Sequence, residues 1–273
     1  MSATADEPSR ARNLHALSGV LPVGVFLIVH VLTNARALAG QGAFDRAMTF
    51  WDGVPLRAFV EIVLVMLPLG FHAGYGVVLM LRPRALADSP YPDSWRVLVR
   101  AAAWVAFAFI AYHVYALGVP RWTNTLATSG VHTLLTAHLS NATGSAAGVL
   151  MPWTALFYLV GLAATTLHFA AGTWGYFVRT KRATTSHDKR RLAIAAGTVG
   201  ALLFGLSSAT VISLATGSPL YASAPESPAC PAPPLPPAPP AAQAPQASTG
   251  SPATPATPTP PAPPTAPSPA ASP

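Results

Sequence analysis

Charged side chains are scarce in this sequence: Asp, Glu, Lys and Arg make up 9% of the 273 residues, whereas 51% are hydrophobic. Soluble domains carry about 25% charged residues, so this composition excludes an ordinary water-soluble domain and indicates a membrane protein. Cysteine is almost absent, and the single one is Cys230. One cysteine excludes an internal disulfide framework, a cysteine-ligated iron–sulfur cluster and covalent attachment of a c-type haem, which needs a C-x-x-C-H motif.

Proline is unevenly distributed, because 21 of the 30 prolines lie from Pro219 onward. A Pro/Ala-rich segment of this kind cannot bury a core and is typical of extended, partly polyproline-II chain. The sequence therefore predicts two parts, an apolar body over residues 1–217 and a disordered tail over residues 218–273.

The apolar body contains five windows long enough to cross a membrane, which takes about 20 apolar residues. They run over residues 17–38, 54–81, 97–119, 149–178 and 192–216. The predicted fold class is an all-α membrane protein with five transmembrane helices.

The basic residues predict the orientation of these spans. Five spans place 12 of the 16 Lys and Arg residues on the side of the N-terminus, and only Arg36, Arg46, Arg57 and Arg121 on the other side. The positive-inside rule then places the N-terminus in the cytoplasm and the tail outside. We expect a multi-pass protein of the inner (cytoplasmic) membrane.

Four histidines lie inside the spans, where ionisable residues are costly and usually functional. At a rise of 1.5 Å per residue, His30 and His113 lie roughly 20 and 24 Å from the cytoplasmic face, and His72 and His168 lie roughly 14 and 15 Å from it. The histidines thus fall into an outer pair, His30 with His113, and an inner pair, His72 with His168.

Two facing imidazoles can serve as the two axial ligands of one haem iron, and helix bundles build such sites from facing side chains. Two levels predict two b-type haems, making the bundle a dihaem one. Glycines on the face of the fourth-span and second-span histidines would leave room for a flat macrocycle; these are Gly76, Gly161 and Gly172. A transition-metal or proton transporter is the alternative from the residues alone, although Glu61 is the only carboxylate available inside the spans.

Other residues are weaker candidates for the same sites. His15 precedes the first span and lies near the edge expected for the inner haem, and Arg179, beyond His168, is a candidate partner for a haem propionate. His132, His138 and His187 lie in loops, where solvated or interfacial positions are expected.

Four segments resemble the cytochrome b subunit of succinate dehydrogenase, of the five-helix, dihaem type. They are NLHALSGVLPVGVFLIVHVLTN at 13–34, PLRAFVEIVLVMLPLGFHAGYG at 55–76, FIAYHV at 109–114 and LHFAAGTWGYF at 167–177. The resemblance covers about residues 12–216 and is weakest between residues 121 and 150.

The resemblance implies a membrane anchor on whose cytoplasmic face a flavoprotein and an iron–sulfur protein dock. It implies His72 with His168 as ligands of the inner haem and His30 with His113 as ligands of the outer haem. Electrons from succinate would pass through both haems to a quinone, usually menaquinone, near the outer haem. The chain itself would be a non-catalytic electron-transfer subunit, with lipid and quinone as further partners and no nucleic acid.

One position departs from some members of that family. Members that work as fumarate reductases have a glutamate two residues before the fourth-span ligand, and this chain has Thr166 there. Succinate oxidation is therefore the favoured direction, and Glu61 is an alternative protonatable group near the outer end of its helix. The cytochrome b anchor of a hydrogenase or formate dehydrogenase, and a haem-free transporter, remain the alternative functions.

Overall fold

The computed structural model describes residues 7–81, 91–123, 130–140 and 153–220, all within the first of two units, residues 1–226. The predicted tail beyond residue 220 lies outside the described residues. The described residues are helical and contain no strand, and five of their helices are long and apolar enough to cross a membrane. The predicted all-α membrane fold with five spans is confirmed. The spans are Arg10–Ala39, Arg57–Leu81, Asp93–Trp122, Trp153–Arg179 and Ser186–Thr216.

The first span is broken at a proline. Helix α1 (Glu7–Val20) ends one residue before Leu21, and α2 (Pro22–Asn34) begins at Pro22 and continues into the short helix η1 (Ala35–Ala39). Proline has no backbone N–H, so it suits the first turn of a helix and interrupts a longer one. The break separates α1, which carries His15, from α2, which carries His30.

The second and third spans each contain a π-helical turn. In the second span, α4 (Arg57–Val60) leads through η2 (Glu61–Met66) into α5 (Leu67–Leu81). In the third, α6 (Asp93–His113) leads through η4 (Val114–Gly118) into α7 (Val119–Trp122). Pro68 and Pro120 follow these turns by two residues and remove one helical hydrogen bond each, which explains the wider turn.

The fourth and fifth spans are single helices that pack closely against each other. Helix α9 runs over Trp153–Arg179 and α10 over Ser186–Thr216. A capping box between Thr185 and Asp188 starts α10, and Gly217, with a φ of 66°, ends it. A Cβ on Gly200 would lie 2.9 Å from the Cβ of Ala170, so the absence of a side chain there permits the close approach.

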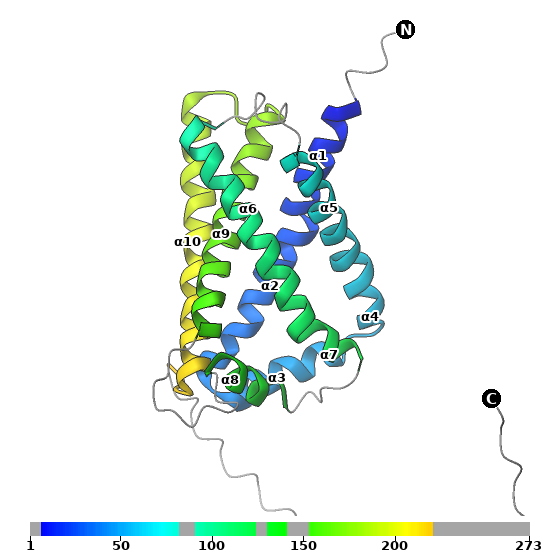
Figure 1. Ribbon diagram of the computed structural model, residues 1–273, viewed down its shortest axis with the longest axis vertical. Coiled ribbons are helices and arrows are strands. Elements are labelled where there is room, and N and C mark those ends of the chain that lie inside the picture. The colour runs from blue at the N-terminus through cyan, green and yellow to red at the C-terminus, as the bar shows by residue number, and fades with distance from the viewer. Residues whose placement is uncertain (1–6, 82–90, 124–129, 141–152, 221–273) are drawn as a thin grey trace, which may run out of the picture. The chain divides into compact units, whose positions relative to one another are not determined.

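Two further helices lie at the end of the bundle opposite the N-terminus (the outer end), where the sequence predicts loops. They are α3 (Gln41–Asp52) and α8 (Val131–Ser140), and Figure 1 shows them across the ends of the spanning helices. Phe44 of α3, 0% exposed, and Leu139 of α8 pack into one apolar cluster with Phe109, Tyr158 and Leu214. These amphipathic helices close the outer end of the bundle.

Candidate functional site

The outer pair of histidines comes together between α2 and the end of α6. The ring centres of His30 and His113 are 5.7 Å apart, and their planes are nearly perpendicular at 85°. Asn34, one turn after His30, donates a hydrogen bond of 2.8 Å to the His30 carbonyl, with its amide nitrogen 3.4 Å from both ring nitrogens. Nδ1 of His113 is buried without a hydrogen-bond partner in the described part of the chain.

The inner pair lies between α5 and α9. The ring centres of His72 and His168 are 6.0 Å apart, with 73° between their planes. Nδ1 of His168 is buried and has no hydrogen-bond partner among the described residues. The structure thus brings together the two pairs that the depth argument joins, and their role as ligands stays a prediction.

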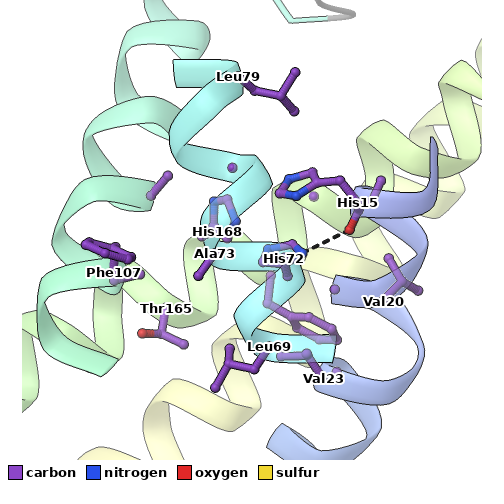
Figure 2. Close-up of a pocket in the computed structure, with 18 of the residues that line it drawn as sticks. His15, Val20, Val23, Leu69, His72, Ala73, Leu79, Phe107, Thr165 and His168 are labelled. Atoms are coloured by element: carbon purple, nitrogen blue, oxygen red, sulfur yellow. Dashed lines mark hydrogen bonds between the residues drawn. The ribbon is translucent and has the colours of Figure 1, made fainter. Parts of the chain in front are cut away.

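His15 of α1 joins the inner pair. Its ring stacks on that of His72 with 4.1 Å between centres and 11° between planes. Its backbone carbonyl lies 2.9 Å from Nδ1 of His72. Figure 2 shows this hydrogen bond and the rings of His15, His72 and His168 around one cavity.

The cavity beside the inner pair has a volume of about 500 Å³ and mainly apolar walls from the first four spans. Pockets of about 300–1,000 Å³ are typical of small-molecule and cofactor sites. His15, His72 and His168 line it, whereas His30 and His113 do not.

The glycines beside the cavity have different roles. Gly172 lines it, and a Cβ there would meet no atom within 4 Å, as the predicted clearance requires. Gly76 also lines it, but its Cβ would lie 3.1 Å from Cε1 of His15, so it makes room for that ring. The prediction for Gly161 is wrong: a Cβ there would lie 2.2 Å from Cγ of Phe109, so this glycine serves the packing of α9 on α6.

Basic residues line the cavity at the end where α1 and α6 begin and α9 ends. They are Arg12, Arg96, Arg100 and Arg179. The predicted residue Arg179 donates a hydrogen bond of 3.1 Å from Nε to Oδ1 of Asn13, and Arg100 donates to the carbonyl of Met80. The cavity thus joins an apolar, histidine-lined interior to a cationic mouth.

Tyr91, just before α6, is a cavity residue that the sequence does not reveal. Its hydroxyl donates to the carbonyl of Ala171, and its ring lies 5.1 Å from that of Trp174. Burial raises the pKa of Tyr91 to about 12, so the side chain stays a neutral donor. An isolated tyrosine before a span gives no signal that would have identified it.

A network of charges lies at the outer end of the second and third spans. Asp52 accepts hydrogen bonds from Arg57 and from Arg121, the latter at 2.6 Å. Glu61 lies 3.5 Å from Arg57 and accepts from Nε1 of Trp122 at 3.3 Å. Glu61, considered from sequence as a protonatable group, is therefore an ion-paired residue that helps to connect these two spans with α3.

The remaining histidines differ in exposure. His187 is exposed, as expected for a solvated residue. His132 lies 5.7 Å from Phe44, and His138 contacts Tyr112 and Tyr158 with ring centres 6.1 and 5.8 Å away. Burial lowers the pKa of His132 and of His138, so both are neutral near pH 7.

Thr166 is buried at the interface of α9 and α10. Its hydroxyl donates to the carbonyl of Leu162 at 2.8 Å, and its backbone lies where a Cβ on Gly200 would approach. No carboxylate occupies this position.

The described residues hold no group of three or more His, Cys, Asp or Glu side chains placed to bind a metal ion. Any metal bound at the histidine pairs would therefore need a group that supplies further ligands, as a macrocycle does.

Comparison with known proteins gives one relative of assigned function. The chain is 34% identical over 169 residues to the succinate dehydrogenase cytochrome b558 subunit of Bacillus subtilis (strain 168). The aligned residues cover 61% of this chain and 77% of that protein. No family model matches the chain, and neither does any solved structure.

Proposed function

Since this chain belongs to the family of succinate dehydrogenase cytochrome b subunits, we propose that it anchors such a complex and passes electrons through two b haems to menaquinone. The two histidine pairs at two depths carry this proposal. The flavoprotein and iron–sulfur subunits of the complex would dock on the face where the N-terminus lies.

The spacing within each pair suits a shared iron. Two imidazoles that ligate the same metal can lie with ring centres up to roughly 6 Å apart, because metal–nitrogen bonds to imidazole are about 2.0–2.1 Å long. The observed separations are 5.7 Å for His30 with His113 and 6.0 Å for His72 with His168. Neutral imidazole is also a ligand that haem iron accepts well.

The surroundings of the inner pair support a macrocycle at that level. Gly172 leaves open space beside His168, and the unpaired Nδ1 of His168 is a buried polar atom of a kind that native structures rarely leave unsatisfied. Arg179, with Arg12, Arg96 and Arg100, offers cations to the propionates at the mouth of the same cavity. His15 contributes to the site through His72.

The chain's own residues set what the site does. Each histidine pair would hold one haem through two neutral imidazoles, a ligand set that suits electron transfer. The mainly apolar walls of the cavity provide low-dielectric surroundings of the kind that tune a redox centre. When bound, haem supplies reversible one-electron chemistry at iron.

The direction of electron flow and the acceptor complete the proposal. Thr166 offers no carboxylate at the position where a glutamate would assist proton transfer, which supports succinate oxidation over fumarate reduction. His72 and His168 would hold the haem nearer the cationic face, and His30 and His113 would hold the haem nearer the menaquinone site.

A reduced-minus-oxidised absorbance spectrum of the purified chain, with the haem-to-protein ratio from the pyridine haemochrome, tests the proposal. We expect two low-spin b haems per chain. His30→Ala or His113→Ala should remove one of them, and His72→Ala or His168→Ala the other. A colourless protein would contradict the proposal and favour a haem-free transporter.

A further inference from the structure

The contact between α1 and α5 fixes the protonation pattern of His72. A backbone carbonyl only accepts hydrogen bonds, so Nδ1 of His72, 2.9 Å from the His15 carbonyl, must carry the proton. Neutral His72 then has its free electron pair on Nε2, the tautomer that can bind a metal through that atom.

The same contact fixes the plane of the His72 ring. His15 stacks on it at 4.1 Å between centres, and two glycines admit the two rings. A Cβ on Gly19 would lie 2.4 Å from Cε1 of His72, and a Cβ on Gly76 would lie 3.1 Å from Cε1 of His15. Each ring thus occupies space that a glycine of the opposite helix provides.

Ser18 shares the same carbonyl. Its hydroxyl donates to the His15 carbonyl at 2.7 Å and lies 3.5 Å from Nδ1 of His72. Two donors therefore share one carbonyl oxygen, and the electron density that Ser18 draws from this oxygen weakens its hydrogen bond with His72.

The Nδ1 atoms of the other three histidines of the two pairs are placed differently in the described part of the chain. Nδ1 of His113 and Nδ1 of His168 have no partner there, and Asn34 lies at 3.4 Å from the ring nitrogens of His30. Among the described residues, a backbone carbonyl at Nδ1 together with a ring stacked from another helix is found at His72 and not at the other three histidines.

We propose that His15 is a positioning residue for His72: its carbonyl sets the tautomer and its ring sets the plane of the imidazole that holds the inner haem. The inference rests on the proposed function, because it concerns a ligand of that haem. It assigns to His15 an action through His72, with no bond of its own to the haem.

Two variants of His15 test the ring contact. In His15→Ala the stacked ring is lost, so the electron paramagnetic resonance signal of the inner ferric haem should shift or broaden and its midpoint potential should move. The g values of a low-spin ferric haem depend on the angle between its two imidazole planes. His15→Phe restores a stacked ring and should restore both properties, while the outer haem stays unchanged in both variants.

Two further variants test the same contact without removing His15. In Ser18→Ala, the His15 carbonyl loses its competing donor, so His72 becomes a more basic ligand and the potential of the inner haem should fall. Gly76→Ala should displace the His15 ring and disturb the signal of the inner haem. Gly74→Ala on the same helix, where a Cβ meets nothing within 4 Å, is the matched control.

The measurements use the full chain purified with two haems bound. The inference is overturned if the inner haem keeps its signal and potential in His15→Ala, or if His15→Phe is as altered as His15→Ala. If His15→Ala does not accumulate, unchanged inner-haem properties in both Ser18→Ala and Gly76→Ala overturn it instead. A wild-type chain without haem would contradict the proposed function itself, whereas two haems indifferent to these variants would contradict this inference alone.

Discussion

Gly161 shows how a single hydrogen atom in place of a side chain controls the contact between α6 and α9. Gly161→Ala would place a Cβ 2.2 Å from Cγ of Phe109, at the base of a ring that is 5% exposed. Overpacking of this kind costs about 1–3 kcal/mol. We expect a lower unfolding temperature in detergent and a disturbed outer haem, because the Phe109 ring lies 5.8 Å from that of His113.

Gly205→Ala is the control for this variant. Gly205 lies inside α10, and a Cβ there would meet nothing within 4 Å, so only helix propensity changes, by up to about 1 kcal/mol in favour of the helix. If Gly161→Ala were as stable as Gly205→Ala, the packing role of Gly161 would be wrong.

At the residue scale, the sequence predicts which histidines lie close together, but it does not predict what the neighbouring glycines contact. The depth of His30, His72, His113 and His168 follows from helical rise alone, and the pairs meet as that rise predicts. The side to which Gly161 or Gly76 turns depends on the rotation of each helix against its neighbour. That rotation is set by packing between segments far apart in the chain, which one sequence does not specify.

At the scale of elements, α3 is predicted to hold the outer end of the bundle closed. Phe44→Ala removes a side chain that is 0% exposed, and such truncations cost about 3–5 kcal/mol in a well-packed core. We expect this variant to lose the haem proposed at His30 and His113 at a lower temperature than the haem proposed at His72 and His168, which absorbance during a thermal ramp would follow. Phe50→Ala on the same helix, where the ring is 68% exposed, should leave the order of loss unchanged.

The five spans are predictable because each is long and apolar, but the finer elements are not. Helices α3 and α8 are short and amphipathic. What their apolar faces pack against depends on the end of the bundle that they cover, and the local sequence does not specify that surface. The π-helical turns before Pro68 and Pro120 depend on how each proline is accommodated, since a helix can also bend or end there.

At the scale of the whole molecule, the orientation in the membrane is open to a direct test. In a chain with Cys230→Ser, single cysteines at exposed positions mark the two ends of the bundle: Gln41→Cys at the first residue of α3 and Thr184→Cys before α10. With the N-terminus in the cytoplasm, a membrane-impermeant maleimide should label Gln41→Cys in intact cells and Thr184→Cys only after lysis. The reverse pattern would contradict the proposed topology.

The two histidine levels also predict that electron transfer through the chain responds to the membrane potential. Electrons that enter at the cytoplasmic end and leave near the outer end move charge with a potential that is negative inside, worth about 2.3 kcal/mol per charge per 100 mV. In sealed, right-side-out vesicles that hold the complete complex and are energised to a potential negative inside, an uncoupler should slow succinate-dependent reduction of menaquinone and speed fumarate reduction by menaquinol. Leaky membranes should show neither effect. Equal rates with and without the uncoupler in sealed vesicles would show that menaquinone is reduced without net charge movement across the bilayer. That result would contradict an acceptor site near His30 and His113.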